Sequence, residues 1–235
     1  MPGTLTYAVG DIHGCYTKLA NLYRHCVDHG GGKPHRFVFL GDYVDRGKRT
    51  RDVINFLIKM QTAAPERVVC LMGNHEDLLL DAAKGGNVPL WLDNGGGATL
   101  HSYGVAAASE LPAAHVDWIA ALPLSTADDK RYYVHAGIMP GVPLKKQVRK
   151  VQLWMREPFL SDKRDHGLFI VHGHTPQQTH LPQLLPNRVN LDTMAVLGGP
   201  LTAAVFDEKT TGPFAFITDD GKIVKAPKIT ELEEA

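Results

Sequence analysis

The feature of this 235-residue chain that most constrains its fold is a series of short apolar runs, each ending in glycine followed by polar residues. The first three runs, residues 5–9, 36–40 and 67–72, are predicted β-strands. The segments between them, residues 16–29 and 50–63, have the apolar spacing of amphipathic helices. Strands that alternate with helices form a parallel sheet, so the first half of the chain is predicted to be βαβαβ.

The second half of the chain is predicted to be mostly β. Five further runs have strand-like composition: residues 132–134, 168–171, 188–191, 201–206 and 214–218. Residues 87–124 instead form helical pieces broken by glycine and proline, and we expect a small helical cap or peripheral lobe there, anchored by Trp91 and Trp118. With 44% hydrophobic residues, the length suits one core, so we expect a single domain over residues 1–235.

Composition excludes several classes of partner. Twenty-five Lys plus Arg balance 25 Asp plus Glu, so no long-range field attracts nucleic acid or an anionic membrane. The chain has no signal-like N-terminus and no apolar stretch of membrane-spanning length, and we expect a cytoplasmic protein of undetermined oligomeric state. Its three cysteines lack CxxC spacing, which predicts reduced, mostly buried thiols and neither a disulfide framework nor a structural zinc site.

Polar residues of metal-binding type follow five of the predicted strands. In chain order they are Asp11 and His13, then Asp42, then Asn74, then His135, and finally His174. Ligands of open α/β sheets bind beyond the carboxyl ends of the strands, so these loops should converge on one crevice. Carboxylate, imidazole and amide oxygen are ligands that Mn, Fe and Zn accept. One such strand end is more often a turn, but five in one chain indicate a metal site.

These motifs also carry a family resemblance. The sequence contains GDIHG, GDYVDRG, GNHE, HAG and GHT, in that order, between Gly10 and Thr175. In this respect it resembles the phosphoprotein phosphatase group of the calcineurin-like metallophosphoesterases. The resemblance implies a four-layer α/β/β/α sandwich with a dinuclear metal centre between its two sheets.

The resemblance also implies a set of ligands for two divalent metal ions, with Mn expected and Fe or Zn as alternatives. Asp11 and His13 would hold the first ion, and Asn74, His135 and His174 would hold the second. Asp42 would bridge them, because a carboxylate has two oxygens and a full charge and allows cations about 3.5–4 Å apart to coexist. A hydroxide held between the ions would then attack phosphorus in line.

Four further residues, together with Asn74, are expected to take part in binding the substrate and in catalysis. Arg46 and Arg156 resemble the arginines that grip phosphate oxygens, and Asn74 is expected to contribute to the same phosphate site. His75 resembles the general acid that protonates the departing oxygen, oriented by Asp45. The alternative for Asp45 is an N-cap of the helix predicted at residues 50–63.

Other features of the sequence receive weaker assignments. A lone histidine is more often structural than a ligand, which applies to His25, His29, His35, His101, His115, His166 and His180. His172 would share a strand face with His174 and is kept as a supporting group behind the ligands. Met194 stands where many bacterial relatives have glycine, so the backbone near the mouth of the site is in question, since methionine accepts positive φ poorly.

Three functions fit these residues. The preferred one is a bacterial-type serine/threonine protein phosphatase, with activity on phosphotyrosine left open, acting on phosphorylated protein or small phosphoesters. A dinucleoside polyphosphate hydrolase, acting for example on diadenosine tetraphosphate, shares the motifs and would need aromatic residues such as Trp91, Tyr103 or Trp118 to stack adenine, although core packing is the expected use of each. The third is an inactive scaffold that binds phosphorylated partners.

Overall fold

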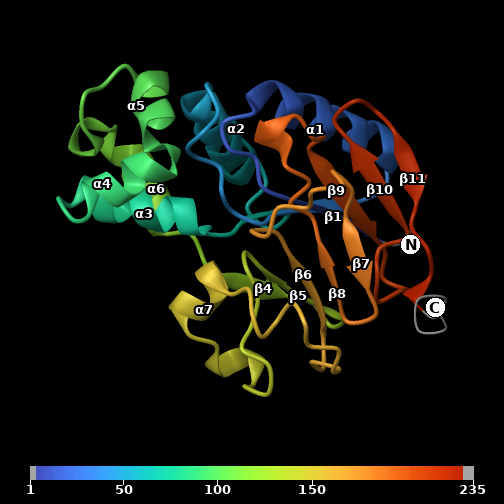
Figure 1. Cartoon of the computed structure of the whole chain (residues 1–235). Helices are drawn as coiled ribbons and strands as arrows, with labels where there is room; N and C mark the ends of the chain where they lie inside the picture. Colours follow the sequence, from blue (N-terminus) through green and yellow to red (C-terminus); the bar gives the residue numbers. More distant parts are fainter. Residues whose placement is uncertain (1–3, 230–235) are drawn as a thin grey trace.

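Two β-sheets packed face to face form the centre of the computed structural model, which describes residues 4–229 (Figure 1). The first sheet has the strand order β11-β10-β9-β1-β2-β3 and the second has the order β4-β5-β6-β8-β7. The strands of the first sheet are β1 (Leu5–Val9), β2 (His35–Phe39), β3 (Val68–Cys70), β9 (Thr202–Phe206), β10 (Ala215–Thr218) and β11 (Ile223–Lys225). Those of the second are β4 (Ser125–Ala127), β5 (Arg131–Val134), β6 (Phe169–His172), β7 (Gln183–Leu185) and β8 (Arg188–Asn190).

The helices lie mainly outside the first sheet. They are α1 (Tyr16–Gly30), α2 (Thr50–Ala63), α3 (Asn74–Ala83), α4 (Val88–Trp91), α5 (Gly97–Tyr103), α6 (Ala113–Ala120) and α7 (Arg149–Trp154). A π-helical turn spans Leu92–Gly96, and short 3₁₀ turns span Ala108–Glu110, Leu144–Lys146 and Ala195–Leu197. Helix α1 ends where Gly31 adopts φ 56°, a left-handed conformation that glycine accepts without strain.

Alternation along the strands explains the layers. In β1, Tyr7 and Val9 face the core beneath α1 and α2, whereas Ala8 faces the second sheet, and β2 alternates in the same way. Strands buried on both faces read as continuous apolar runs, which is why they stood out in the sequence. A third apolar cluster, around Phe159 and Ile170, lies between the second sheet and a thin outer layer that includes α7. The predicted four-layer α/β/β/α fold is therefore confirmed.

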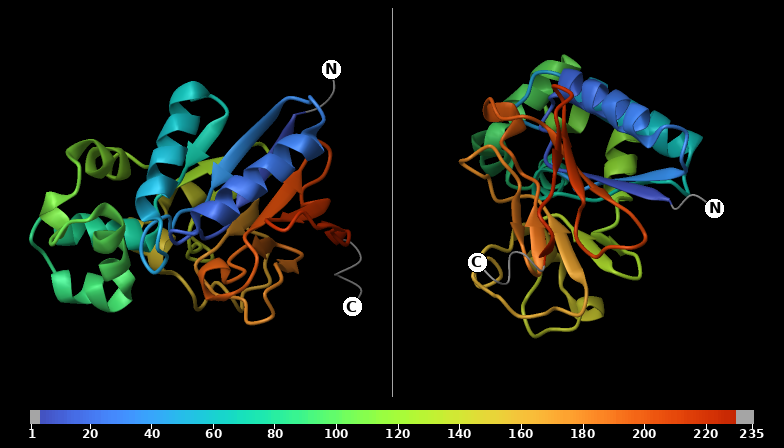
Figure 2. Two further views of the ribbon diagram at one scale, coloured as in Figure 1. Left: turned by 90° about the horizontal axis from the view of Figure 1, so that it is seen from above. Right: turned by 90° about the vertical axis from the view of Figure 1, so that its right-hand side faces the viewer.

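Parallel pairing brings the carboxyl ends of the central strands to one edge of each sheet. Strand β1 pairs in parallel with β2, and β2 with β3. In the second sheet β5 pairs in parallel with β6, and β6 with β8. The side view shows the two sheets stacked one on the other (Figure 2). The motif-bearing loops therefore leave the two sheets close to one another.

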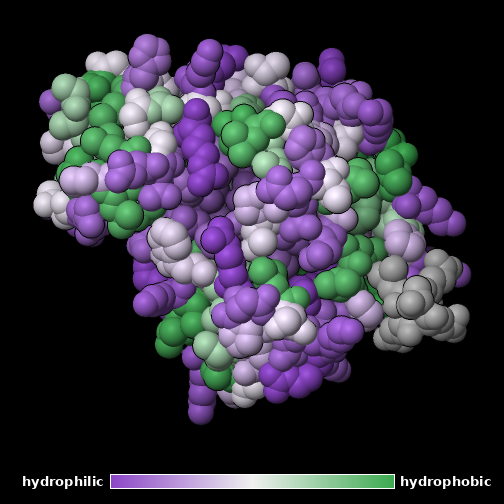
Figure 3. Space-filling view, viewed as in Figure 1, coloured by the Kyte–Doolittle hydropathy of each residue, from purple (hydrophilic) through white to green (hydrophobic). Residues whose placement is uncertain are grey.

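The segment between α3 and β4 is helical and lies beside the sheets. Helices α4, α5 and α6 pack against α2 and α3, and they are drawn in green in Figure 1. We call residues 88–120 the helical lobe. Hydrophilic side chains gather between this lobe and the strands of the second sheet (Figure 3). Within residues 4–229, no helix combines the length and hydrophobicity needed to cross a bilayer.

Candidate active site

The loops at the strand ends are hydrogen-bonded to one another. The backbone N–H of His13, after β1, donates to the carbonyl of Asp42, after β2, at 2.8 Å. In the second sheet, the N–H of Gly173 donates to the carbonyl of His135 at 2.8 Å. The two sheets meet at Asp11, whose carboxylate oxygens both accept the N–H of His174 at 3.2 Å. The N–H of His75, after β3, donates to Oδ1 of Asp42 at 3.1 Å, so all five predicted loops belong to one continuous site.

Backbone strain is concentrated in these loops. Among residues 4–229, seven non-glycine residues have positive φ, and five of them are predicted site residues: His13 (43°), Asp42 (53°), Asp45 (69°), Arg46 (64°) and His174 (65°). A left-handed residue other than glycine costs roughly 1–2 kcal/mol and persists only where surrounding contacts hold it. Such strain is typical of sites in which side chains are held in fixed directions.

Glu76 is the main contact that holds the loop after β2, and its role was missed in the sequence. Its Oε2 accepts the backbone N–H groups of Asp42 and Gly73, both at 2.8 Å, and its Oε1 accepts those of Tyr43 and Val44 at 2.8 and 3.2 Å. The signal was present, because a glutamate three residues after the residue that caps α3 is a capping pattern. Glu76 is fully buried, so four N–H donors converge on one carboxylate.

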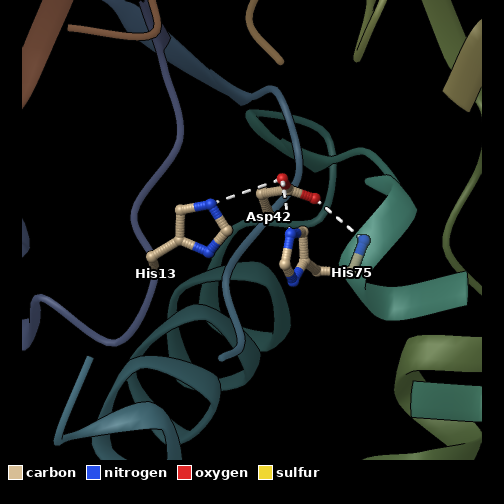
Figure 4. Close-up of side chains that lie close together, drawn as sticks. All are labelled: His13, Asp42 and His75. Carbon is tan, nitrogen blue, oxygen red and sulfur yellow. Dashed lines mark hydrogen bonds and ion pairs between the residues drawn. The ribbon is translucent and has the colours of Figure 1, made fainter. Parts of the chain in front are cut away.

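The Asp42 carboxylate lies between two groups of imidazole side chains. Its Oδ2 is 3.5 Å from Nε2 of His13 and 3.9 Å from Nε2 of His75, and both rings turn toward it (Figure 4). Its Oδ1 is 3.4 Å from Nε2 of His135, which belongs to the second group together with His174. Each group, with Asp42, has ligand atoms within 4.8 Å of one another. One carboxylate therefore belongs to two candidate metal-binding clusters.

Hydrogen bonds to backbone carbonyls fix which ring nitrogen faces the site. Nδ1 of His13 lies 2.8 Å from the carbonyl of Val44, and Nδ1 of His135 lies 3.0 Å from that of Leu40. A carbonyl only accepts, so each Nδ1 carries a proton. Burial is the largest cause that lowers the pKa of both rings well below the usual value, which keeps them neutral. Each Nε2 thus presents a lone pair to the site, as a metal ligand must.

The second group fits a cation for a further reason. Nε2 of His135 and Nδ1 of His174 both lie 2.9 Å from Oδ1 of Asn74, next to the Asp42 carboxylate. Carbonyl oxygen, carboxylate oxygen and unprotonated Nε2 are all electron-pair donors, and their convergence is unfavourable without a positive charge among them. The residues present therefore fit a divalent metal ion with nitrogen and oxygen ligands.

Crowded negative charge points to the same conclusion. Burial, followed by the charges of Asp192 and Asp42, raises the pKa of Asp11 well above its ordinary value. Burial also raises the pKa of Asp42, and it raises that of Asp192 to about 6. Bound cations reverse such shifts by compensating the carboxylates. Asp192 is a second residue that the sequence reasoning did not assign to the site, although it lies two positions before the noted Met194.

A buried carboxylate–imidazole pair lies beside the first group. Nδ1 of His75 donates to Oδ2 of Asp45 at 2.8 Å, and both side chains are almost completely inaccessible. Burial acts to lower the pKa of His75, but the charge of Asp42 and then the hydrogen bond to Asp45 raise it above the ordinary value. Helix α2 is capped by Arg49, so the alternative of Asp45 as its N-cap is wrong. Asp45 instead faces the site.

The two predicted arginines are exposed at the site. The Arg46 guanidinium lies 2.9 Å from Nε2 of His13, to which it donates, and 2.9 Å from Nε2 of His75. Arg156 follows α7 from the other side, and after burial its charge is the next cause that lowers the pKa of His174 to about 3. The structure thus brings both cations toward the ligand groups from different parts of the chain.

A family model described as calcineurin-like phosphoesterase matches residues 5–201, most of the chain. The chain belongs to the calcineurin-like phosphoesterase family. The predicted classification as a metallophosphoesterase is thereby confirmed.

Known proteins similar to this chain include several kinds of phosphatase. It is 31% identical over 152 residues to the serine/threonine-protein phosphatase PP2A-like PPG1 of Candida albicans, an alignment that covers 64% of this chain and about a third (33%) of that relative's length. This agrees with the phosphoprotein phosphatase group indicated by the motifs.

The solved structure of a candidate diadenosine tetraphosphatase has TM-score 0.68 and 24% identity, covering 97% of this chain and 95% of that one. A cold-active protein-tyrosine phosphatase of a psychrophilic Shewanella has TM-score 0.66 and 18% identity, covering 97% and 83%. At these identities, the structural matches establish a shared fold.

Three details of the phosphoesterase differ from what the sequence suggested. His172 does not share a face with His174, because β6 ends at His172; its ring contacts Phe159, whereas the His174 ring contacts His135. Met194 adopts φ 61°, so the left-handed turn is kept although glycine is absent. The compact group around Asp42 contains His75 in addition to His13, while Asp11 lies against the His174 backbone.

Proposed function

We propose that the protein is a dinuclear metal-dependent phosphomonoesterase and, more specifically, a serine/threonine protein phosphatase. The observation that carries the proposal is the position of Asp42, whose two carboxylate oxygens face different imidazole groups. A bridging carboxylate is what a two-metal phosphatase site requires. Manganese suits the donor set, because the ligand groups contain carboxylate, amide and imidazole and no thiolate.

The proposed ligands are divided on the two sides of Asp42. Asp11 and His13 would hold one ion, and Asn74, His135 and His174 would hold the other. When bound, the two ions supply Lewis acidity toward the phosphoryl group and lower the pKa of water toward neutrality. The lone pair on Nε2 of His13 is oriented by its Nδ1–H bond to Val44, and that of His135 by its bond to Leu40, so neither ring has to turn or lose a proton before binding.

The remaining residues handle phosphate and proton. Arg46 and Arg156 grip non-bridging oxygens with planar guanidinium groups, and Asn74 supports the same phosphate site. His75 protonates the departing alkoxide, and Asp45 keeps its Nδ1 protonated so that Nε2 carries the transferred proton. An inactive scaffold would need neither this acid pair nor a bridged ligand set, which argues against the third function.

The choice of protein phosphatase over dinucleoside polyphosphate hydrolase is supported by the aromatic residues of the helical lobe. Trp91 is fully buried and its indole N–H donates to Asp45. The Tyr103 hydroxyl is 2.8 Å from Nδ1 of His115, and the indole N–H of Trp118 donates to Gln61 at 2.8 Å. Trp91 is thus enclosed, and Tyr103 and Trp118 pack against the hydrophobic core, which is the use expected of these rings rather than stacking an adenine.

The test is a substrate panel with manganese. Phosphoserine, phosphothreonine and phosphotyrosine peptides and diadenosine tetraphosphate are supplied at equal concentration, and kcat/KM is measured for each. We expect kcat/KM for the phosphopeptides to be well above that for the dinucleotide. Preference for the dinucleotide would replace the protein phosphatase assignment with the polyphosphate hydrolase. Full turnover of p-nitrophenyl phosphate after removal of all metal, verified by elemental analysis, would overturn the metal mechanism itself.

A further inference from the structure

The Asp45 carboxylate is held by the helical lobe as well as by the site. It is completely buried. The indole Nε1–H of Trp91 donates to both of its oxygens at 3.1 Å, and the Thr99 hydroxyl donates to Oδ1 at 2.7 Å. Its Oδ2 also accepts a hydrogen bond from Nδ1–H of His75, at 2.8 Å. Two lobe residues thus occupy the sides of the carboxylate that His75 does not use.

Thr99 fixes the backbone of Asp45 as well as its side chain. Its hydroxyl oxygen accepts a hydrogen bond from the backbone N–H of Asp45 at 2.9 Å, and its hydroxyl group donates one to the Asp45 carboxylate. A residue with φ 69° needs such support, because the left-handed conformation is disfavoured for aspartate. The hydroxyl of Thr50, at the start of α2, lies 3.4 Å from the same oxygen and can donate to it. Thr99 therefore joins α2, the lobe and Asp45.

The glycine-rich turn of the lobe completes this contact. The backbone N–H of Arg46 donates to the carbonyl of Gly95 at 3.1 Å. The Gly96 backbone approaches the Trp91 ring so closely that a Cβ at position 96 would come within 2.4 Å of it. The close approach sets the position of the indole, and hence the direction of its N–H. The lobe thus forms hydrogen bonds with both Asp45 and Arg46.

We propose that Trp91 and Thr99 are positioning residues for the general acid of the proposed phosphatase reaction. The inference rests on the proposed function, in which His75 protonates the leaving group. A carboxylate can rotate about χ2, and three charge-assisted donors fix that rotation. With Asp45 fixed, the His75 ring is held in the orientation and tautomer that direct Nε2 toward the departing oxygen. Core packing alone does not require the indole N–H or the Thr99 hydroxyl to reach this carboxylate.

The test compares leaving groups, since a misplaced acid matters only where protonation is needed. Trp91→Phe keeps the buried ring and removes the N–H, and Thr99→Val keeps the shape and removes the hydroxyl. We expect each to lower kcat about tenfold on a phosphoserine peptide, with KM little changed, and less than about twofold on p-nitrophenyl phosphate, whose leaving group needs little protonation. Thr99→Ser restores the hydroxyl and should recover most of the lost rate.

Trp118→Phe is the matched control. It removes an indole N–H from the same lobe, but that group donates to Gln61 and not to the site. We expect it to leave the ratio of the two rates unchanged. Metal content is measured in every variant. In the zinc-loaded protein, the downfield ¹H resonance of His75 Nδ1–H, identified by its loss in His75→Asn, should exchange faster in Trp91→Phe and Thr99→Val and not in Trp118→Phe.

Two results would separate the possible failures. If His75→Asn shows the leaving-group-dependent deficit while Trp91→Phe and Thr99→Val lose the same factor on both substrates, the positioning role is overturned and the two residues serve packing. If His75→Asn itself loses no more rate on the peptide than on p-nitrophenyl phosphate, His75 is not the acid and the proposed mechanism fails first. If either Trp91→Phe or Thr99→Val does not fold, the remaining one of these two variants still tests the proposal, since each removes a different donor to Asp45.

Discussion

Single residues fix the directions of the ligand side chains, and Glu76 does so through the largest number of backbone hydrogen bonds described for the site. Its two oxygens accept four backbone N–H groups, which belong to Gly73 and to the three consecutive residues 42–44. The strained Asp42 belongs to this segment. The loop geometry is therefore imposed from α3, a different part of the chain from the loop itself.

Glu76→Gln tests this arrangement. The amide has nearly the same shape, but its NH₂ group must face two backbone donors, so two buried N–H groups lose their acceptor. We expect a loss of about 2–4 kcal/mol in the free energy of unfolding, measured by urea denaturation. Glu66→Gln is the control, because Glu66 is exposed before β3 and its amide should change stability by less than about 0.5 kcal/mol. Equal stability of the two variants would contradict the role given to Glu76.

Arg46 provides the test of the phosphate site. Arg46→Ala should lower kcat/KM by roughly 10²–10³, the size of effect for one well-placed transition-state donor. Arg46→Lys should recover only part of this, since an ammonium keeps the charge and loses the planar fork. Inhibition by free phosphate should weaken in parallel. Arg24→Ala, on the exposed side of α1, is the control. Near-normal kinetics and phosphate inhibition in Arg46→Ala would remove this arginine from the substrate site.

At the level of helices and strands, the sequence predicted the elements that have strong periodicity. Strands β1 and β2, buried on both faces, and helices α1 and α2, amphipathic over several turns, were found close to their actual positions. Strands β4, β7 and β11 were not, because each has three residues and remains largely or partly exposed, so no apolar pattern marks it. They pair antiparallel with the adjacent strands of the chain, β5, β8 and β10 respectively. Their strand conformation therefore depends on that pairing more than on an apolar pattern of their own.

The candidate site shows the same division between local and long-range information. The ligand-type residues were identifiable because each follows a strand and belongs to a motif. The roles of Trp91 and Thr99 were not, because a buried tryptophan and threonine in a helical segment read as core. Their contacts with Asp45 span 46 and 54 positions of sequence and arise only when the lobe packs against α2 and α3. Spacing along one segment carries no information about such contacts.

Gly173 tests how closely the two sheets must approach. It follows β6, and a Cβ there would lie 2.1 Å from Oδ1 of Asp11, which follows β1. Gly173→Ala should therefore displace Asp11, weaken manganese retention and lower turnover by roughly 10², as a shift of about 1 Å does. Gly97→Ala is the control, because nothing lies within 4 Å of its Cβ position and it begins a helix. The comparison needs metal content and kcat. Normal metal content in Gly173→Ala would show that Asp11 is not constrained by this contact.

For the whole molecule, the sandwich concentrates buried negative charge between its two sheets while the overall formal charge is zero. Asp11, Asp42 and Asp192 are almost fully buried within one site, and burial raises the pKa of each. Three carboxylates in this position oppose folding when they are ionised and uncompensated. The site should therefore lower the free energy of unfolding of the metal-free protein and raise that of the metal-loaded protein.

This difference leads to a prediction in which one substitution changes stability in opposite directions. A ligand that binds only the folded state stabilises it by about 2.7 kcal/mol at a concentration of 100 Kd, so manganese should raise the midpoint of thermal unfolding and a chelator should lower it. Asp42→Asn removes the shared charge and keeps an oxygen that can accept the His75 backbone N–H. Without metal, the variant should be more stable than the wild type, because one buried charge is gone. With saturating manganese it should be less stable, because the bridge is lost. Thermal and urea unfolding of both proteins, with chelator and with manganese, measure the four values.

Asp52→Asn, a half-exposed substitution at the start of α2, should leave the manganese-dependent gain unchanged. If manganese stabilises Asp42→Asn as much as it stabilises the wild type, Asp42 does not join the two ligand groups, and the two-metal proposal fails at the carboxylate on which it depends.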